Sequence, residues 1–189
     1  DGTICRIGGK TLDQEGYDLM GLICGSEGLL GVITEVTAKI LKKPQVVKAA
    51  LIGFPTIEEG ANATSEIISS GIIPAGMEIM DKALIEATDN FSKAGYPRDA
   101  ELLLIVEVDG TESEVDILLK DVSSICKKNN CSSLKLSQSE KERLSFWSGR
   151  KSAFPACGAM APDYYCMDGV IPRGKLAEAL LEIKRLSEK

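Results

Sequence analysis

Histidine is absent from this sequence of 189 residues. It is the side chain whose ordinary pKa lies nearest to neutral pH, so the usual general base of an enzyme active site is missing from the chain. Closely spaced cysteine pairs are absent too, because the six cysteines stand at positions 5, 24, 126, 131, 157 and 166 without a C-x-x-C motif. Zinc and iron–sulfur sites therefore have little support, and we predict no metal site within the chain.

Excess positive charge and long apolar runs are also missing. The formal net charge is −6, whereas a protein that binds nucleic acid needs concentrated Lys and Arg to neutralise phosphates. No apolar run approaches the roughly 20 residues that span a bilayer, so we expect no transmembrane segment. Scattered cysteines in an acidic chain are typical of small buried thiols in a reducing compartment, which favours a cytoplasmic protein.

The chain also lacks an initiator methionine and opens at Asp1-Gly2. An Asp-Gly pair that leads into residues 3–7 is typical of a hairpin turn entering a strand. Because the other strand of such a hairpin would precede Asp1, we interpret the sequence as an internal piece of a longer protein. On that interpretation, the missing signal peptide says nothing about targeting.

Two parts of the chain differ in texture. Residues 1–44 hold eight glycines, at positions 2, 8, 9, 16, 21, 25, 28 and 31, followed by a β-branched run at 32–40 that predicts a strand. Pro44 closes that run, because proline and the residue before it resist regular structure. We therefore place a domain boundary there and expect one domain over 1–44 and a second over 45–189.

The second part alternates strands and helices. Its patterns predict strands at 46–54, 75–80, 102–108, 133–136 and 164–170, and helices at 57–70, 82–90, 112–128, 139–150 and 174–189. The two strand–helix–strand units at 46–80 and 102–136 indicate an α+β fold, a ferredoxin-like α/β layer with added helices. Such a layer serves many functions, so the function must be argued from a site.

Two glycine-rich segments are candidates for ligand binding. Gly9-Lys10-Thr11 ends like a P-loop, but Ile4 stands where that motif requires glycine, and we set it aside. Residues 25–31, GSEGLLG, lead into a strand and not into a helix, so they are not a Rossmann motif. Their glycines would let a flat ligand approach the backbone, with free N–H groups from Ser26 to Ile33. A structural turn is the alternative, and chemistry alone does not choose between them.

Four longer stretches resemble one family. YDLMGLICGSEGLLGVITE at 17–35 is similar to the end of the flavin-binding domain of FAD-linked oxidases, with Leu29 where the family usually has threonine. GIIPAGMEIMD at 71–81, WSGRKSAFP at 147–155 and APDYYCMDGVIP at 161–172 resemble the family's substrate domain. The family includes the D subunit of glycolate oxidase, D-lactate dehydrogenases and D-2-hydroxyglutarate dehydrogenase.

The resemblance implies FAD as the cofactor of the full-length protein. It makes 1–44 the trailing edge of a flavin-binding domain and 45–189 a substrate domain that is incomplete at its C-terminus. The family's diphosphate loop and metal-binding histidines lie outside the chain, so we expect no catalytic residue here and little retention of FAD by the chain alone. One wall of the flavin site is expected from Gly25, Ser26, Glu27, Gly28, Gly31, Val32 and Ile33.

The substrate side of the resemblance centres on Arg150. A guanidinium offers two parallel N–H groups to a carboxylate, and the family's Trp-x-x-Arg arginine binds the substrate carboxylate. The alternative is an arginine that satisfies the carbonyls at a helix end. Tyr164 and Tyr165 lie on an expected strand and would face opposite sides, one toward the substrate. Glu78, in an otherwise apolar strand, has two possible roles, an ion pair within the domain or a contact to the flavin domain.

The resemblance therefore implies oxidation of a small 2-hydroxyacid to a 2-oxoacid by hydride transfer to flavin. We expect electron-accepting partner subunits, iron–sulfur subunits among them, which would also provide any attachment to a membrane. Two other classes stay open: a ferredoxin-like module that binds a regulatory ligand, and an interaction subunit whose glycine loop docks on a flavoprotein.

Overall fold

The computed structural model describes residues 2–11 and 16–187 and divides the chain into two units, Asp1–Lys42 and Lys43–Lys189. The first unit contains helix α1 (Leu19–Ile23), whose N-cap residue Asp18 accepts a hydrogen bond from the N–H of Gly21 at 2.9 Å. Among the described residues of this unit none is buried. It therefore has no hydrophobic core of its own within those residues.

The strands expected at 3–7 and 32–40 do not form, although Arg6 and Glu35 from these two segments make an ion pair at 3.3 Å. A strand requires a second backbone to complete its hydrogen bonds, and no described segment pairs with either one. A β-branched sequence alone was insufficient, so both predictions were wrong. Asp1 of the expected turn lies outside the described residues.

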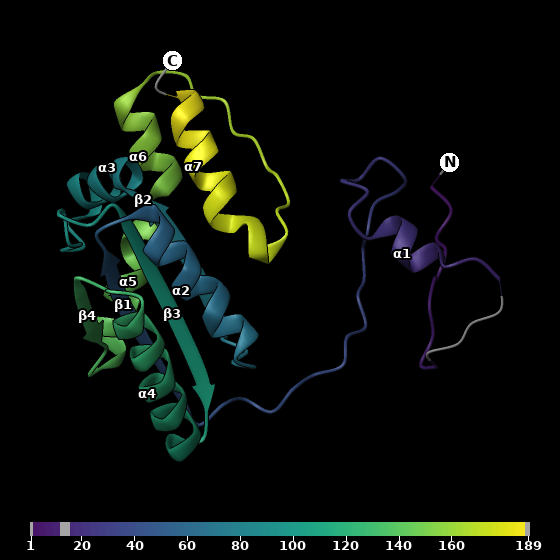
Figure 1. The fold of residues 1–189 in the computed structure, drawn as a ribbon. Helices are drawn as coiled ribbons and strands as arrows, with labels where there is room; N and C mark the ends of the chain where they lie inside the picture. The colour runs from purple at the N-terminus through teal and green to yellow at the C-terminus, as the bar shows by residue number, and fades with distance from the viewer. Residues whose placement is uncertain (1, 12–15, 188–189) are drawn as a thin grey trace. The chain divides into compact units, whose positions relative to one another are not determined.

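The second unit is built on a four-stranded antiparallel sheet with the order β2-β3-β1-β4 (Figure 1). Its strands are β1 (Val46–Phe54), β2 (Gly76–Asp81), β3 (Leu102–Gly110) and β4 (Ser133–Leu136). The connecting helices are α2 (Ile57–Ser69), α3 (Lys82–Ser92) and α4 (Glu112–Lys128). Two strand–helix–strand units joined in this order form a ferredoxin-like layer, which confirms the α+β prediction.

Local signals explain where the helices begin. The hydroxyls of Thr56 and Thr111 accept hydrogen bonds from the N–H groups three residues later. The Glu114 carboxylate in turn accepts from the backbone N–H of Thr111, which completes a capping box. Ser139 caps helix α5 (Glu140–Lys151) in the same way. Each cap satisfies a backbone donor that the first turn of a helix leaves without a partner.

Both faces of the sheet are covered. Along β3, Leu104 and Val106 face a core shared with α2 and α4, while Leu103 and Ile105 face a second core shared with α3 and α5. This alternation follows from the two-residue period of a strand. The apolar residues on both faces of this central strand therefore support helices on both sides of the sheet. Arg150 belongs to α5, on the same side of the sheet as α3.

The C-terminal part differs from expectation. Helix α6 (Ala153–Met160) was not predicted. Its Pro155 lies in the first turn, where a backbone N–H is not required. The strand expected at 164–170 is absent, since no described strand pairs with it, and that prediction was wrong. A 3-10 turn (Arg173–Lys175) leads into α7 (Leu176–Ser187), which packs beside α2 (Figure 1). Residues 188–189 of the expected last helix lie outside the described residues.

Candidate functional site

Helix α5 presents a row of polar side chains to the sheet. Arg143, Trp147 and Arg150 are spaced by four and three residues, so they share one side of the helix. Arg143 Nη1 lies 2.5 Å and Trp147 Nε1 lies 2.7 Å from the same carboxylate oxygen of Glu107 on β3. One acid thus fixes two of the three side chains, and with them the rotation of α5 on the sheet.

The third side chain of the row, Arg150, reaches the edge strand β2. Its Nε lies 3.1 Å from Oε2 of Glu78. Gly76 lies two residues earlier on the same strand and leaves room for the Trp147 ring, since a Cβ there would lie 3.3 Å from two ring carbons. Of the two roles left open for Glu78, the structure therefore shows the ion pair within the domain.

The two Nη groups of Arg150 are the donors that this arrangement leaves available. Neither Nη has a hydrogen-bond partner among the described residues, and the side chain is 35% exposed. Glu78 is 42% exposed, and an ion pair this open to water contributes little to folding stability. Glu78 does hold Nε, which leaves the two Nη groups as a parallel pair of donors matched to a carboxylate.

Tyr96 contacts the same end of α5 and was missed in the sequence. It lies between α3 and β3, is 4% exposed, and its hydroxyl donates to the carbonyl of Phe146 at 2.5 Å. The same hydroxyl accepts from the backbone N–H of Arg150 at 3.1 Å. Burial raises the pKa of this phenol above its usual value, so it stays protonated and able to donate. A signal was present, namely an aromatic residue between glycine and proline in a polar loop.

Tyr164 and Tyr165 are not brought to Arg150 by any contact among the described residues. Tyr164 is 51% exposed and packs against α6, with its ring centroid 6.3 Å from that of Phe154. Tyr165 is 87% exposed. Without the expected strand, the expectation that they face opposite sides of a sheet does not apply.

The glycine-rich loop at 25–31 is open. Gly25 and Gly28 have φ of 84° and 80°, and Glu27 has a φ of 52°, so the loop uses backbone conformations that favour glycine. A Cβ at Gly25, Gly28 or Gly31 would meet no atom within 4 Å. The N–H groups of Ser26 and Leu29 bond within the loop, to Ile23 and Ser26 carbonyls, which corrects the expectation that all of them are free. The other backbone donors of the loop have no partner among the described residues.

Comparison with known proteins identifies the family. The model of FAD linked oxidases, C-terminal domain, matches residues 43–189. The chain belongs to the FAD-linked oxidase family. It is 48% identical over 188 residues to glycolate oxidase subunit GlcD of Escherichia coli K12, covering 100% of this chain and 38% of that protein.

Other relatives extend the FAD-linked oxidase assignment. The mitochondrial D-lactate dehydrogenase [cytochrome] of Arabidopsis thaliana is 36% identical over 172 residues, or 90% of this chain and 30% of that one. A solved structure of alkyldihydroxyacetonephosphate synthase aligns with a TM-score of 0.65 and 21% identity, covering 92% of this chain and 37% of that one. That likeness supports the fold alone. The chain thus spans well under half the length of these relatives.

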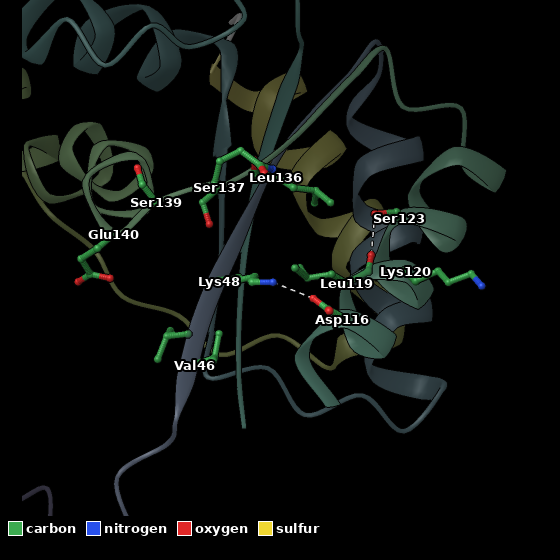
Figure 2. A pocket seen from close by; sticks show the side chains of 12 residues that line it. Val46, Lys48, Asp116, Leu119, Lys120, Ser123, Leu136, Ser137, Ser139 and Glu140 are labelled. Carbon is green, nitrogen blue, oxygen red and sulfur yellow. Dashed lines mark hydrogen bonds and ion pairs between the residues drawn. The ribbon is translucent and has the colours of Figure 1, made fainter. Parts of the chain in front are cut away.

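Two hollows lie in the second unit of this FAD-linked oxidase chain, and the predicted site residues do not line them. Figure 2 shows one of about 690 Å³ between β1, α4 and residues 136–140, where Lys48 and Asp116 pair at 2.7 Å. The other, of about 710 Å³, lies between α2, residues 71–77 and the start of α7. Neither hollow is lined by Arg150, Tyr164 or Tyr165.

Two further findings concern the described residues. No group of three or more Cys, Asp or Glu side chains is arranged there to hold a metal ion. None of the helices in that part of the chain combines the length and the apolar character that crossing a bilayer requires.

Proposed function

We propose that the protein to which this chain belongs oxidises a small 2-hydroxyacid to the 2-oxoacid with FAD as cofactor. The observation that carries the proposal is the state of Arg150: Glu78 holds its Nε at 3.1 Å, while neither Nη has a partner among the described residues and the side chain is 35% exposed. Every 2-hydroxyacid carries a carboxylate, which binds such a fork through two parallel hydrogen bonds. The relatives named for glycolate and D-lactate support this substrate class.

The chain's own residues have three roles in this proposal. Arg150 orients the acid through its carboxylate, and Tyr164 and Tyr165 lie on the segment that follows α6 and complete the substrate side. The open loop that includes Gly25 and Gly28 lines one wall of the flavin site. Flavin, when bound, accepts the hydride equivalent from the substrate carbon. Residues 1–44 then form the edge of the FAD-binding domain and 45–189 the substrate domain.

Cofactor and partners are part of the same proposal. The loop at 25–31 offers backbone donors but includes the acidic side chain of Glu27, which does not favour a diphosphate, so the chain alone binds FAD weakly. The word subunit in the name of the Escherichia coli relative supports electron-accepting partner chains, with iron–sulfur subunits among them. The six cysteines lie free, which supports a reducing compartment such as the cytoplasm.

Anaerobic flavin reduction tests the proposed function. The complete reading frame that encodes this chain is expressed, and the purified flavoprotein is mixed with glycolate, D-lactate or L-lactate while its visible absorbance is followed. We expect at least one acid to bleach the flavin band. Acetate and propionate are the matched controls, because they keep the carboxylate but have no hydroxyl to oxidise. A protein without flavin, or a flavin that none of these acids reduces, would overturn the proposal.

A further inference from the structure

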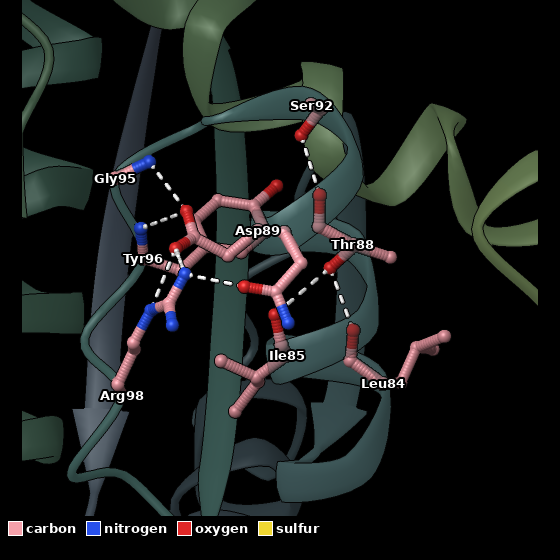
Figure 3. A network of polar contacts seen from close by, with 9 residues as sticks. Leu84, Ile85, Thr88, Asp89, Ser92, Gly95, Tyr96 and Arg98 are labelled. Carbon is pink, nitrogen blue, oxygen red and sulfur yellow. Dashed lines mark hydrogen bonds and ion pairs between the residues drawn. The ribbon is translucent and has the colours of Figure 1, made fainter. Parts of the chain in front are cut away.

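The backbone at Tyr96 is held in place by a buried carboxylate, that of Asp89. Asp89 on α3 is 6% exposed and accepts hydrogen bonds from the backbone N–H groups of Gly95 at 2.7 Å and Tyr96 at 3.1 Å. The second oxygen of Asp89 accepts hydrogen bonds from Nε and Nη2 of Arg98 at 2.9 and 2.7 Å, as Figure 3 shows. These four hydrogen bonds between Asp89 and the loop after α3 leave the Tyr96 backbone little freedom. The ring is therefore delivered to a defined point on α5.

That point is a single hydrogen-bonding step of helix α5. In a regular helix the N–H of residue 150 bonds to the carbonyl of residue 146. Here the Tyr96 hydroxyl donates to that carbonyl at 2.5 Å and accepts from that N–H at 3.1 Å. The hydroxyl thus bonds to both backbone groups of this step, and a side chain that inserts into the hydrogen-bond ladder can set the local direction of a helix. The residue whose N–H the hydroxyl accepts is Arg150.

Gly149 shows how closely the ring approaches. A Cβ at this position would lie 2.3 Å from one ring carbon of Tyr96 and 2.5 Å from its hydroxyl oxygen. Only glycine leaves room for the phenol against the backbone at this step. The approach therefore depends on both residues, Tyr96 from the loop and Gly149 from the helix.

We propose that Tyr96 is a positioning residue for Arg150, acting through the α5 backbone to aim the guanidinium at Glu78 and at the substrate carboxylate. The catalytic part of this inference rests on the proposed function, while the structural part does not. A phenylalanine would fill the same space but would leave the carbonyl of Phe146 and the N–H of Arg150 without the bridging hydroxyl. Loss of the hydroxyl oxygen should therefore change the position of Arg150 more than the packing of the rest of the core.

The structural part is tested in the 189-residue chain by ¹⁵N NMR. Solvent exchange is measured for the backbone N–H and the Nε–H of Arg150 in the wild type and in Tyr96→Phe. We expect the Nε–H rate to rise roughly three- to tenfold as the guanidinium loses its alignment on Glu78, the change that corresponds to one net hydrogen bond. Ser137→Ala is the matched control, because Ser137 is 4% exposed and its hydroxyl bonds to the backbone N–H of Ala49 at 2.9 Å. Unchanged exchange at Arg150 in Tyr96→Phe would overturn the inference.

The catalytic part is tested in the complete protein by steady-state kinetics with the acid that bleaches its flavin. We expect Tyr96→Phe to raise KM roughly three- to tenfold with little change in kcat, because the acid binds a misaligned fork. Ser137→Ala should leave both constants unchanged. If the wild type oxidises no 2-hydroxyacid while the exchange effect is present, the proposed function fails and the structural inference stands. If oxidation depends on Arg150 but Tyr96→Phe alters neither exchange nor KM, the inference fails and the function stands.

Discussion

Asp89 is a buried carboxylate whose ionisation stabilises the loop that carries Tyr96. Burial by itself would raise the pKa of this carboxyl, but the hydrogen bonds from Arg98, Tyr96 and Gly95 outweigh it and hold the pKa below its usual value. A carboxyl with a depressed folded-state pKa stabilises the fold above its unfolded pKa of about 4. That contribution is lost as the pH falls through the folded-state value.

Asp89→Asn should therefore show a pH-dependent penalty. At pH 7 we expect the free energy of unfolding to fall by about 1.5 to 3 kcal/mol, since charge-assisted hydrogen bonds are lost. At pH 3 and below the gap should narrow, because the wild-type carboxyl becomes protonated and then resembles the amide. Urea denaturation at both pH values measures the difference in the free energy of unfolding between the wild type and Asp89→Asn. Asp116→Asn, at a residue 60% exposed, is the control and should change stability little. An equal gap at both pH values would contradict this account.

Cysteine reactivity should separate buried from exposed thiols. Burial raises the pKa of the Cys126 thiol to about 12, so almost no reactive thiolate exists at pH 8. Cys5, Cys24 and Cys166 are exposed. We expect iodoacetamide to label these three within minutes while Cys126 stays unmodified until the protein unfolds, as mass spectrometry of digested protein would show. Rapid labelling of Cys126 in the native protein would mean that α4 opens easily.

At the scale of elements, helix α5 depends on a glycine and α6 does not. Gly149→Ala places a Cβ 2.3 Å from the Tyr96 ring, whereas Gly158→Ala places one 3.8 Å from Tyr164, an ordinary contact. We expect Gly149→Ala to lower the free energy of unfolding by about 1 to 3 kcal/mol through overpacking. Gly158→Ala should be neutral or slightly stabilising, because alanine favours helix. Thermal melts of both variants measure the difference, and equal melting temperatures would contradict the packing described for Tyr96.

The elements that the sequence predicted are those with local causes. Thr56, Thr111 and Ser139 cap their helices through residues three positions away, and the strands β1 and β3 consist mainly of apolar residues. The strands expected at 3–7, 32–40 and 164–170 failed because pairing depends on a distant backbone. Tyr96 escaped notice for a similar reason, since its partner Phe146 is 50 residues away. Arg150 was found through family resemblance, while its bond to Glu78 required the fold.

At the scale of the whole molecule, the two units differ in what protects their backbone. None of the described residues of 2–42 is buried, whereas β1 and β3 lie at the centre of the four-stranded sheet. We expect amide hydrogen exchange by mass spectrometry to show slow exchange for β1 and β3 and near-complete exchange within seconds for residues 17–41. Equal protection in both units would show that residues 2–42 are part of one cooperative fold.

The central claim is that Arg150 binds the substrate carboxylate, and kinetics of Arg150 variants in the complete protein test it most directly. We expect Arg150→Ala to raise KM for the 2-hydroxyacid about ten- to hundredfold, the loss of roughly 1.5 to 3 kcal/mol of charge-assisted binding. Arg150→Lys should recover only part of this, because lysine keeps the charge but not the paired donors. Lys151→Ala, which removes the same charge one residue away, should leave KM unchanged. Wild-type KM in both Arg150 variants, with flavin content and melting temperature intact, would contradict the claim and make Arg150 a structural partner of Glu78 alone.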